Sequence, residues 1–88
     1  MSKSVIVTGA SKGIGKSTVL ELINKGYKVL AVDHNKTDLA YLEKDLIKNN
    51  NRDSLETLCY ELSDIAGIGK IIDTCKNKFG GLYGLVNN

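Results

Sequence analysis

Apolar and polar positions follow one another along the chain in blocks that predict four strands and three helices. Short apolar or β-branched runs at 5–7 and 28–32 are typical of buried strands, and 55–62 and 82–86 are predicted to form the third and fourth strands. Between these runs, apolar residues recur at three- and four-residue intervals, which indicates helices with one buried face. The predicted helical stripes are Val19, Leu22 and Ile23, flanked by Leu20; Leu39, Leu42 and Leu46; and Ile65, Ile68, Ile72, Cys75 and Phe79.

Glycines and short polar side chains mark the expected ends of these elements. Gly26 stands where a left-handed residue would end the first helix, and Gly80 with Gly81 would end the third. The polar run 49–53 is predicted to be a loop. The expected N-terminal caps of the second and third helices are Thr37 or Asp38 and Ser63 or Asp64.

Strands that alternate with helices predict an α/β fold with a parallel sheet and right-handed crossovers, because a tight hairpin cannot reach a parallel neighbour. The expected strand order is 3-2-1-4. This is a Rossmann-like arrangement that lacks the second half of a doubly wound sheet. No repeat or proline-rich linker interrupts the pattern, so we expect a single domain over residues 1–88.

Composition narrows the possible functions. Of 88 residues, 42% are hydrophobic and 25% are charged, which is ordinary for a globular domain. Neither a membrane-spanning run nor a secretory signal is recognisable, so we expect a cytoplasmic protein without a membrane partner. A net charge of +2, with scattered lysines, gives little support to nucleic-acid binding. Cys59 and Cys75 lack zinc-site spacing and His34 is the only histidine, so no metal site is expected.

The segment from Thr8 to Gly15, between the first strand and the first helix, has the composition of a phosphate-binding turn. A phosphate group needs backbone N–H donors, the positive end of a helix dipole and no obstructing side chains. Gly9 permits a sharp exit from the strand and Gly13 a close approach of the backbone to a pyrophosphate. Gly15 allows the helix to pack closely on the sheet.

The same residues, Thr8-Gly9-Ala10-Ser11-Lys12-Gly13-Ile14-Gly15, resemble the TGxxxGxG fingerprint of short-chain dehydrogenases/reductases. Leu85-Val86-Asn87-Asn88 resembles the start of that family's NNAG motif, at the separation that the family shows. The resemblance implies an NAD(P)-binding segment of an oxidoreductase that transfers hydride between a nicotinamide cofactor and an alcohol or carbonyl substrate. The domain would then be the N-terminal dinucleotide-binding part of a Rossmann domain.

The resemblance also implies roles for individual residues. The pyrophosphate and ribose would be lined by the glycine turn, and Asp33 would accept hydrogen bonds from the adenine ribose. Glu61 and Leu62 would contact the adenine, and Asn88 the ribose nearer the nicotinamide. The candidate cofactor-binding residues are Gly9, Ser11, Lys12, Gly13, Ile14, Gly15, Asp33, Glu61, Leu62, Asn87 and Asn88.

The chain departs from the family pattern in three respects. Glu61 replaces a usual aspartate, and Tyr83 stands where the family commonly has aspartate. The family's catalytic serine and YxxxK tyrosine and lysine would lie beyond Asn88, and no tyrosine here has a lysine four residues on. We therefore name no catalytic residue and expect the 88 residues alone to catalyse no hydride transfer.

Two alternatives remain. Ala10-x4-Gly15-Lys16-Ser17 matches a relaxed P-loop pattern in which Lys16 would bind ATP phosphates and Ser17 magnesium. The chain could instead be a ligand-free fragment that acts as an assembly module.

Two further expectations concern partners. NAD is expected in preference to NADP because Asp33 would repel a 2′-phosphate, although Lys12 could attract it. A homo-oligomer is expected because the last strand would be an open edge.

Overall fold

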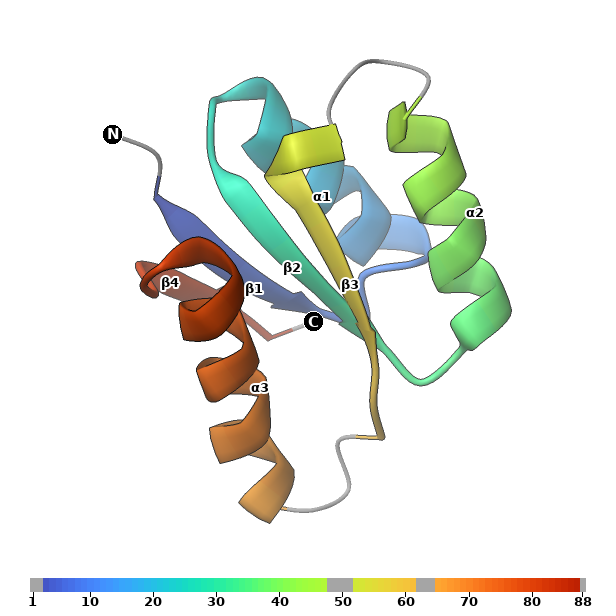
Figure 1. Ribbon diagram of the computed structural model, residues 1–88. Coiled ribbons are helices and arrows are strands. Elements are labelled where there is room, and N and C mark those ends of the chain that lie inside the picture. The colour runs from blue at the N-terminus through green and yellow to red at the C-terminus, as the bar shows by residue number, and fades with distance from the viewer. Residues whose placement is uncertain (1–2, 48–51, 62–64, 88) are drawn as a thin grey trace.

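Four strands alternate with three α-helices in the computed structural model, which describes residues 3–47, 52–61 and 65–87 (Figure 1). The elements, in chain order, are β1 (Ser4–Thr8), α1 (Gly13–Asn24), β2 (Lys28–Asp33), α2 (Lys36–Ile47), a 3-10 turn η1 (Arg52–Ser54), β3 (Leu55–Cys59), α3 (Ile65–Phe79) and β4 (Gly84–Val86). No helix in these described ranges is long and apolar enough to cross a membrane.

The strands form one parallel sheet in the order β3-β2-β1-β4, which confirms the predicted topology. Val5 pairs with Val29 on one side and with Gly84 on the other, so β1 lies inside the sheet. Side chains along each strand alternate between the two faces of the sheet. The side chains of β1 and β2 are buried on both faces, as the unbroken apolar runs predicted.

The helices cover the two faces of the sheet unequally. Helices α1 and α2 pack on one face, and α3 packs on the other (Figure 1). The core under α1 and α2 is Val5, Val7, Ala10, Val19, Ile23, Val29, Ala31, Leu39, Leu42, Leu46 and Leu55. The smaller core under α3 is Ile6, Leu30, Val32, Ile71 and Cys75.

The start of α2 differs from the prediction of a Thr37 or Asp38 cap. The side-chain oxygen Oδ1 of Asn35 accepts a hydrogen bond from the backbone N–H of Asp38 at 3.1 Å. The carbonyl of Asn35 accepts the first helical bond, from the N–H of Leu39 at 3.1 Å. Asn35 is therefore the cap, because its amide reaches the third helical N–H. The expected caps of α3, Ser63 and Asp64, lie outside the described residues.

Both outer strands are shorter than the apolar runs that predicted them. β3 ends at Cys59, which pairs with Asp33 at the end of β2, and the N–H of Tyr60 makes one more bond to the Asp33 carbonyl at 2.9 Å. The pairing of β3 with β2 therefore ends where β2 ends. β4 likewise begins at Gly84 rather than Leu82, since β1 begins at Ser4, whose carbonyl accepts from the N–H of Tyr83 at 2.7 Å.

The buried face of α3 is rotated relative to the predicted stripe. Cys75 is fully buried as expected, and Ile72 and Phe79 are partly buried. Ile71, which the prediction missed, is 3% exposed, whereas Ile68 is 45% exposed. Gly67 explains the rotation in part, because a Cβ there would collide with the ring of Tyr60. The ring of Tyr60 therefore packs where a side chain of α3 would otherwise lie.

Candidate functional site

The glycine turn leads directly from β1 into α1. Gly9 and Gly13 have φ of 59° and 54°, a left-handed conformation that side chains other than glycine adopt at a cost. Lys12 is the N-cap of α1 but makes no side-chain capping bond, and the first turn of the helix contains no acidic residue. In the part of the chain that the structure describes, the helix therefore begins without a side-chain cap or an acidic residue of its own, and its positive end suits an anion.

The surface above the turn is open. A Cβ built on Gly13 meets no atom within 4 Å, so the backbone is accessible from this side. Ile14 is 76% exposed beside it, and Gly15 is buried within the first turn of the helix. The turn thus has the shape of a cradle that a side chain would fill, and it fits the pyrophosphate of a dinucleotide.

The carboxylate of Asp33 lies at the end of β2, against this turn. Its Oδ2 accepts hydrogen bonds from the hydroxyl of Ser11 at 2.6 Å and from the Ser11 N–H at 3.2 Å. Its Oδ1 accepts from the N–H of Asn35 at 3.3 Å. Burial raises the pKa of this carboxyl, but the bonds from Ser11, Asn35 and the backbone of His34 together lower it below its usual value. Asp33 is therefore an ionised acceptor beside the glycine turn.

Two further side chains make polar contacts in this region, His34 with Asp33 and Lys12 with Asp38. Nδ1 of His34 lies 3.2 Å from Asp33 Oδ1, and the imidazole is 71% exposed. Nζ of Lys12 lies 3.1 Å from Asp38 Oδ2 in the first turn of α2. His34 directly follows Asp33 in the sequence, and the path of the chain after β2 brings its ring to the carboxylate.

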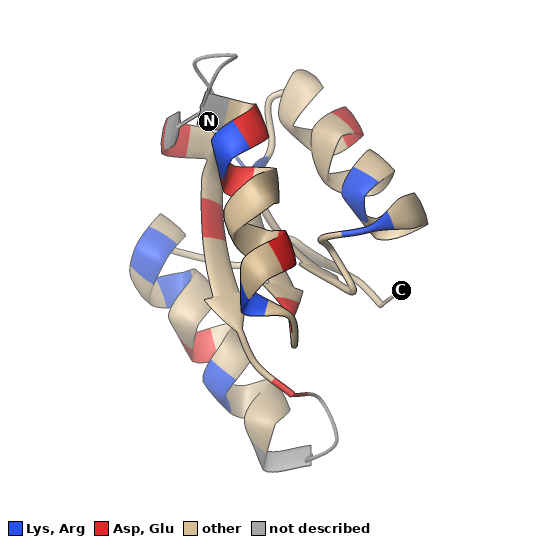
Figure 2. Ribbon diagram, turned by 90° about the vertical axis from the view of Figure 1, so that its right-hand side faces the viewer, with Lys and Arg blue, Asp and Glu red and all other residues tan. Residues whose placement is uncertain are grey.

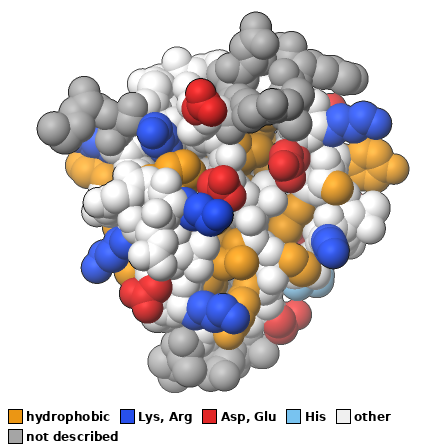
Figure 3. Space-filling model, in the orientation of Figure 1, with side chains coloured by type: hydrophobic (Ala, Val, Ile, Leu, Met, Phe, Trp, Pro, Cys, Tyr) orange, Lys and Arg blue, Asp and Glu red, His pale blue; other side chains and the backbone are white. Residues whose placement is uncertain are grey.

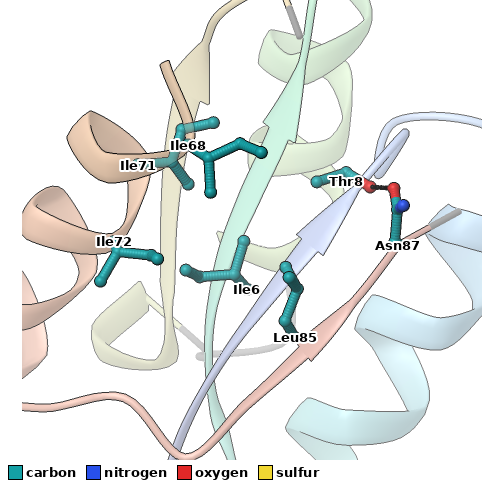
Figure 4. A pocket seen from close by; sticks show the side chains of 7 residues that line it. All are labelled: Ile6, Thr8, Ile68, Ile71, Ile72, Leu85 and Asn87. Atoms are coloured by element: carbon teal, nitrogen blue, oxygen red, sulfur yellow. Dashed lines mark hydrogen bonds between the residues drawn. The ribbon is translucent and has the colours of Figure 1, made fainter. Parts of the chain in front are cut away.

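Asn87 lies across the sheet edge from the glycine turn. The hydroxyl of Thr8 is 3.0 Å from Asn87 Oδ1 and 3.4 Å from the carbonyl of Val86, which joins the carboxyl ends of β1 and β4. These two residues adjoin an apolar pocket of about 150 Å³ between the sheet and α3 (Figure 4). The pocket is lined by Ile6, Thr8, Ile68, Ile71, Ile72, Leu85 and Asn87.

The remaining candidate residues lie after the end of β3, outside the described residues or in an ion pair with α2. Glu61 is exposed after the end of β3, while Leu62 and Asn88 lie outside the described residues. Nζ of Lys16 lies 3.1 Å from Asp45 Oδ2 on α2, which engages the lysine that the P-loop alternative requires. Among the residues whose placement is described, no group of three histidine, cysteine or acidic side chains could hold a metal ion.

Charged side chains of both signs are spread over the surface. Figure 2 shows acidic and basic positions along α2 and α3, and Figure 3 shows the two signs intermixed with hydrophobic side chains on one face. Asp45 with Lys16 and Glu21 with Lys25 are ion pairs in this distribution. The turn at Gly9–Gly15 is thus distinguished by its backbone and by Asp33, rather than by a field of one sign.

The sequence matches a family model described as short chain dehydrogenase over residues 3–88. The 3-oxoacyl-(acyl-carrier-protein) reductase of Staphylococcus aureus is 35% identical over 88 residues, which are 100% of this chain and 35% of that protein. The chain therefore spans little more than a third of the length of such relatives.

Solved structures share the fold. Glucose dehydrogenase of Caenorhabditis elegans superposes with a TM-score of 0.89 and 29% identity, covering 98% of this chain and 37% of its own. YwfH, an NADPH-dependent reductase involved in bacilysin biosynthesis, superposes with a TM-score of 0.90 and 25% identity. That match covers 100% of this chain and 37% of the YwfH chain.

Proposed function

Because the chain belongs to the short-chain dehydrogenase family, we propose that its residues 1–88 are the N-terminal dinucleotide-binding part of a Rossmann domain. The observation that carries this proposal is the uncapped N-terminus of α1, with an open backbone at Gly13 and an ionised Asp33 beside it. A dinucleotide presents its pyrophosphate to such a helix N-terminus and its ribose to an acidic side chain further along the chain.

In this proposal each part of the cofactor meets a different group of the chain. The backbone at Gly9 and Gly13 binds the pyrophosphate, with Ser11, Lys12, Ile14 and Gly15 completing the turn. Asp33 accepts hydrogen bonds from the adenine ribose, and Glu61 and Leu62 contact the adenine. Asn87 and Asn88 lie toward the nicotinamide ribose. When bound, the nicotinamide supplies or accepts a hydride.

Substitution of Gly13 tests the binding site. Gly13→Ala is expected to weaken NADH binding at least tenfold, because a methyl group projects into the space of the pyrophosphate. Gly26→Ala is the matched control, since Gly26 also has a positive φ, of 93°, and open space around it, but ends α1 at the other end. The measurement is calorimetric titration of both variants and the original chain with NADH, NADPH and Mg-ATP.

Equal NADH affinity in the original chain and in Gly13→Ala, both folded by circular dichroism, would contradict the proposal. Binding of Mg-ATP that is lost in Lys16→Ala would favour the P-loop alternative instead. No binding of any of the three nucleotides would support a ligand-free assembly module.

We also propose that NAD is preferred to NADP at neutral pH. Asp33 is held by Ser11 and Asn35 where a 2′-phosphate would meet its charge, whereas Lys12 is 74% exposed and already paired with Asp38. Charge-assisted hydrogen bonds to ribose contribute roughly 1.5 to 3 kcal/mol, and an exposed lysine about 0 to 1 kcal/mol. The net preference is therefore about 5- to 30-fold in Kd.

The preference is tested in the same titrations. Asp33→Asn should shrink or reverse it, and Lys12→Ala should increase it. The NADPH dependence of YwfH is an argument for the opposite preference. If the original chain binds NADPH more tightly than NADH at neutral pH, Lys12 outweighs Asp33.

The parent reaction is proposed to be hydride transfer between the nicotinamide and an alcohol or carbonyl substrate. The 88 residues alone are expected to be inactive, because no tyrosine with a lysine four residues on is present to protonate a carbonyl oxygen. We further propose self-association through β4 and a cytoplasmic location.

A further inference from the structure

Lysine and tyrosine side chains gather at the edge of the sheet where the strands begin, opposite the glycine turn. Figure 1 shows the beginnings of β1, β2 and β4 together at this edge, near the ends of α1 and α3. We call Lys3, Lys25, Tyr27, Lys28 and Tyr83 the amino-edge surface. We propose that this surface docks an acidic segment of a partner protein. The inference goes beyond the proposed function, because the dinucleotide turn follows the other end of β1.

Backbone hydrogen bonds hold three separate segments of the chain side by side at this edge. The N–H of Lys28 donates to the carbonyl of Lys3 at 2.8 Å, and the N–H of Tyr83 donates to the carbonyl of Ser4 at 2.7 Å. An open hollow of about 200 Å³ at the same edge is lined by Lys3, Lys25, Gly26 and Tyr27. The sheet therefore fixes the spacing of the segments that carry the charges.

Tyr83 stands at a position where the family pattern commonly has aspartate. The ammonium of Lys3 lies 4.2 Å from the centroid of the Tyr83 ring, and the centroid of the Tyr27 ring lies 6.0 Å from it. An aspartate beside Lys3 would compensate the lysine charge, whereas an aromatic ring attracts the ammonium and leaves its net charge in place. Tyr83 is 60% exposed, so the amino-edge surface presents both an aromatic side chain and a cation to solvent.

The carboxylates near this edge offset its charge only weakly. Oε1 of Glu21 lies 3.4 Å from Nζ of Lys25, but both side chains are 65% exposed, and ion pairs of this kind are weak. Asp53 precedes β3, and β2 lies between β3 and β1. Toward β1 and β4, the described part of this edge is therefore basic, in a chain whose net charge is +2.

The end of α3 extends the basic region. Its last turn carries Lys76 and Lys78, and the ring centroid of Phe79 lies 5.9 Å from Nζ of Lys28. Lysines in the last turn of a helix also offset the helix dipole. The proposal therefore rests on the amino-edge surface, and the two lysines of α3 add to its positive potential.

The chemistry of this surface favours carboxylates over nucleic acid. Single-stranded nucleic acids bind through bases that stack on aromatic rings, and a base would have to displace Lys3 from the Tyr83 ring to do so. Carboxylates need no such displacement, because they can approach the ammonium groups from solvent. Tyrosine is enriched in protein interfaces, and opposite charges select the partner and speed the encounter. An acidic protein segment therefore fits this surface.

The experiment titrates the chain into a fluorescein-labelled peptide of alternating glutamate and glycine and measures fluorescence anisotropy. We expect saturable binding at low salt that is lost at about 1 M salt, where the Debye length is about 3 Å. Lys3→Glu and Lys28→Glu should each weaken binding about two- to tenfold, because each reverses the charge at this edge. Tyr83→Asp should weaken it as well, because a carboxylate beside Lys3 competes with the peptide.

Matched controls separate this edge from charge in general. Lys36→Glu reverses an exposed lysine at the start of α2, at the opposite edge of the sheet, and should bind the peptide as the original chain does. Tyr83→Phe keeps the ring beside Lys3 and should also bind normally. Circular dichroism checks that each variant is folded. Lys3→Glu, Lys28→Glu and Tyr83→Asp should retain the NADH affinity of the original chain.

The inference is overturned if a peptide with glutamine in place of glutamate binds equally well, or if the glutamate peptide does not bind at low salt. It is also overturned if Lys36→Glu weakens binding as much as Lys3→Glu. Tighter binding of a labelled oligothymidylate, lost in Lys3→Glu, would make this edge a nucleic-acid surface instead. NADH binding in the same samples would leave the proposed function standing in each case.

Discussion

At the scale of single residues, Asp33 links the stability of the fold to pH. Ser11 and Asn35 donate to its carboxylate, and the pKa of that group is lowered in the folded chain. A lowered pKa means that the folded state binds the proton less tightly than the unfolded state. Its stabilising contribution is therefore present above the unfolded pKa of about 4 and is lost as pH falls through the lower folded value.

Asp33→Asn should consequently destabilise the chain at neutral pH and have a smaller effect in acid. We expect a cost of about 1 to 3 kcal/mol at about pH 7, typical of hydrogen bonds to a charged group. The measurement is urea unfolding of both proteins at about pH 7 and about pH 3, below the model-peptide value for aspartate. An equal difference between them at both pH values would show that Asp33 does not titrate in this way.

Some residues of the site could be predicted from the sequence and others could not. The glycine turn and Asp33 follow from a strand–turn–helix pattern in which each residue acts through the backbone or at a strand end. The Ser11–Asp33 bond joins two separate segments of the chain. It has no spacing signature, because the distance between the two segments is determined by the pairing of β1 with β2.

At the scale of elements, α3 contains two glycines in different surroundings. A Cβ on Gly67 would collide with the ring of Tyr60, whereas a Cβ on Gly69 meets nothing within 4 Å. Gly69→Ala should therefore stabilise the chain by up to about 1 kcal/mol through helix propensity. Gly67→Ala has the same propensity gain but must displace the Tyr60 ring from the core under α3.

We expect Gly67→Ala to be less stable than Gly69→Ala by about 1 to 2 kcal/mol. Thermal unfolding of the two variants side by side measures the difference, and each serves as the other's control for propensity. Equal melting temperatures would mean that the Tyr60 ring moves aside without loss of packing.

The ends of elements show why apolar runs alone predict strands too long. Leu82 belongs to an apolar run, yet β4 begins two residues later because β1 offers no partner before Ser4. Ile68 and Ile71 are the same residue type on one helix, and only the folded structure shows that Ile71 is buried in the core under α3 while Ile68 is exposed. These boundaries depend on partners that are distant along the chain.

At the scale of the whole molecule, the side of the sheet at β4 exposes apolar surface. Leu82, Tyr83 and Leu85 are 36%, 60% and 55% exposed, and Leu85 also lines the apolar pocket. Among the described strands, β4 pairs only with β1, so one row of its backbone groups has no strand partner. Exposed strand edges with apolar side chains favour association.

We therefore expect the chain to self-associate at micromolar concentration. Leu85→Lys should shift sedimentation toward the monomer, since a charge on an open strand opposes edge pairing. Ile14→Lys is the matched control, because Ile14 is also exposed but lies in the first turn of α1 and not on β4. A cooperative, stable monomer of the original chain at these concentrations would contradict the expectation.

The unequal cores on the two faces of the sheet have a consequence for hydrogen exchange. Among the residues that the structure describes, eleven buried residues form the core under α1 and α2, and five form the core under α3. Detachment of α3 exposes less apolar surface than opening of the opposite face, so it costs less free energy. Backbone amides of α3 should then exchange with deuterium faster, through a partial opening. Backbone amides of β1 and β2 should exchange only when the entire sheet unfolds.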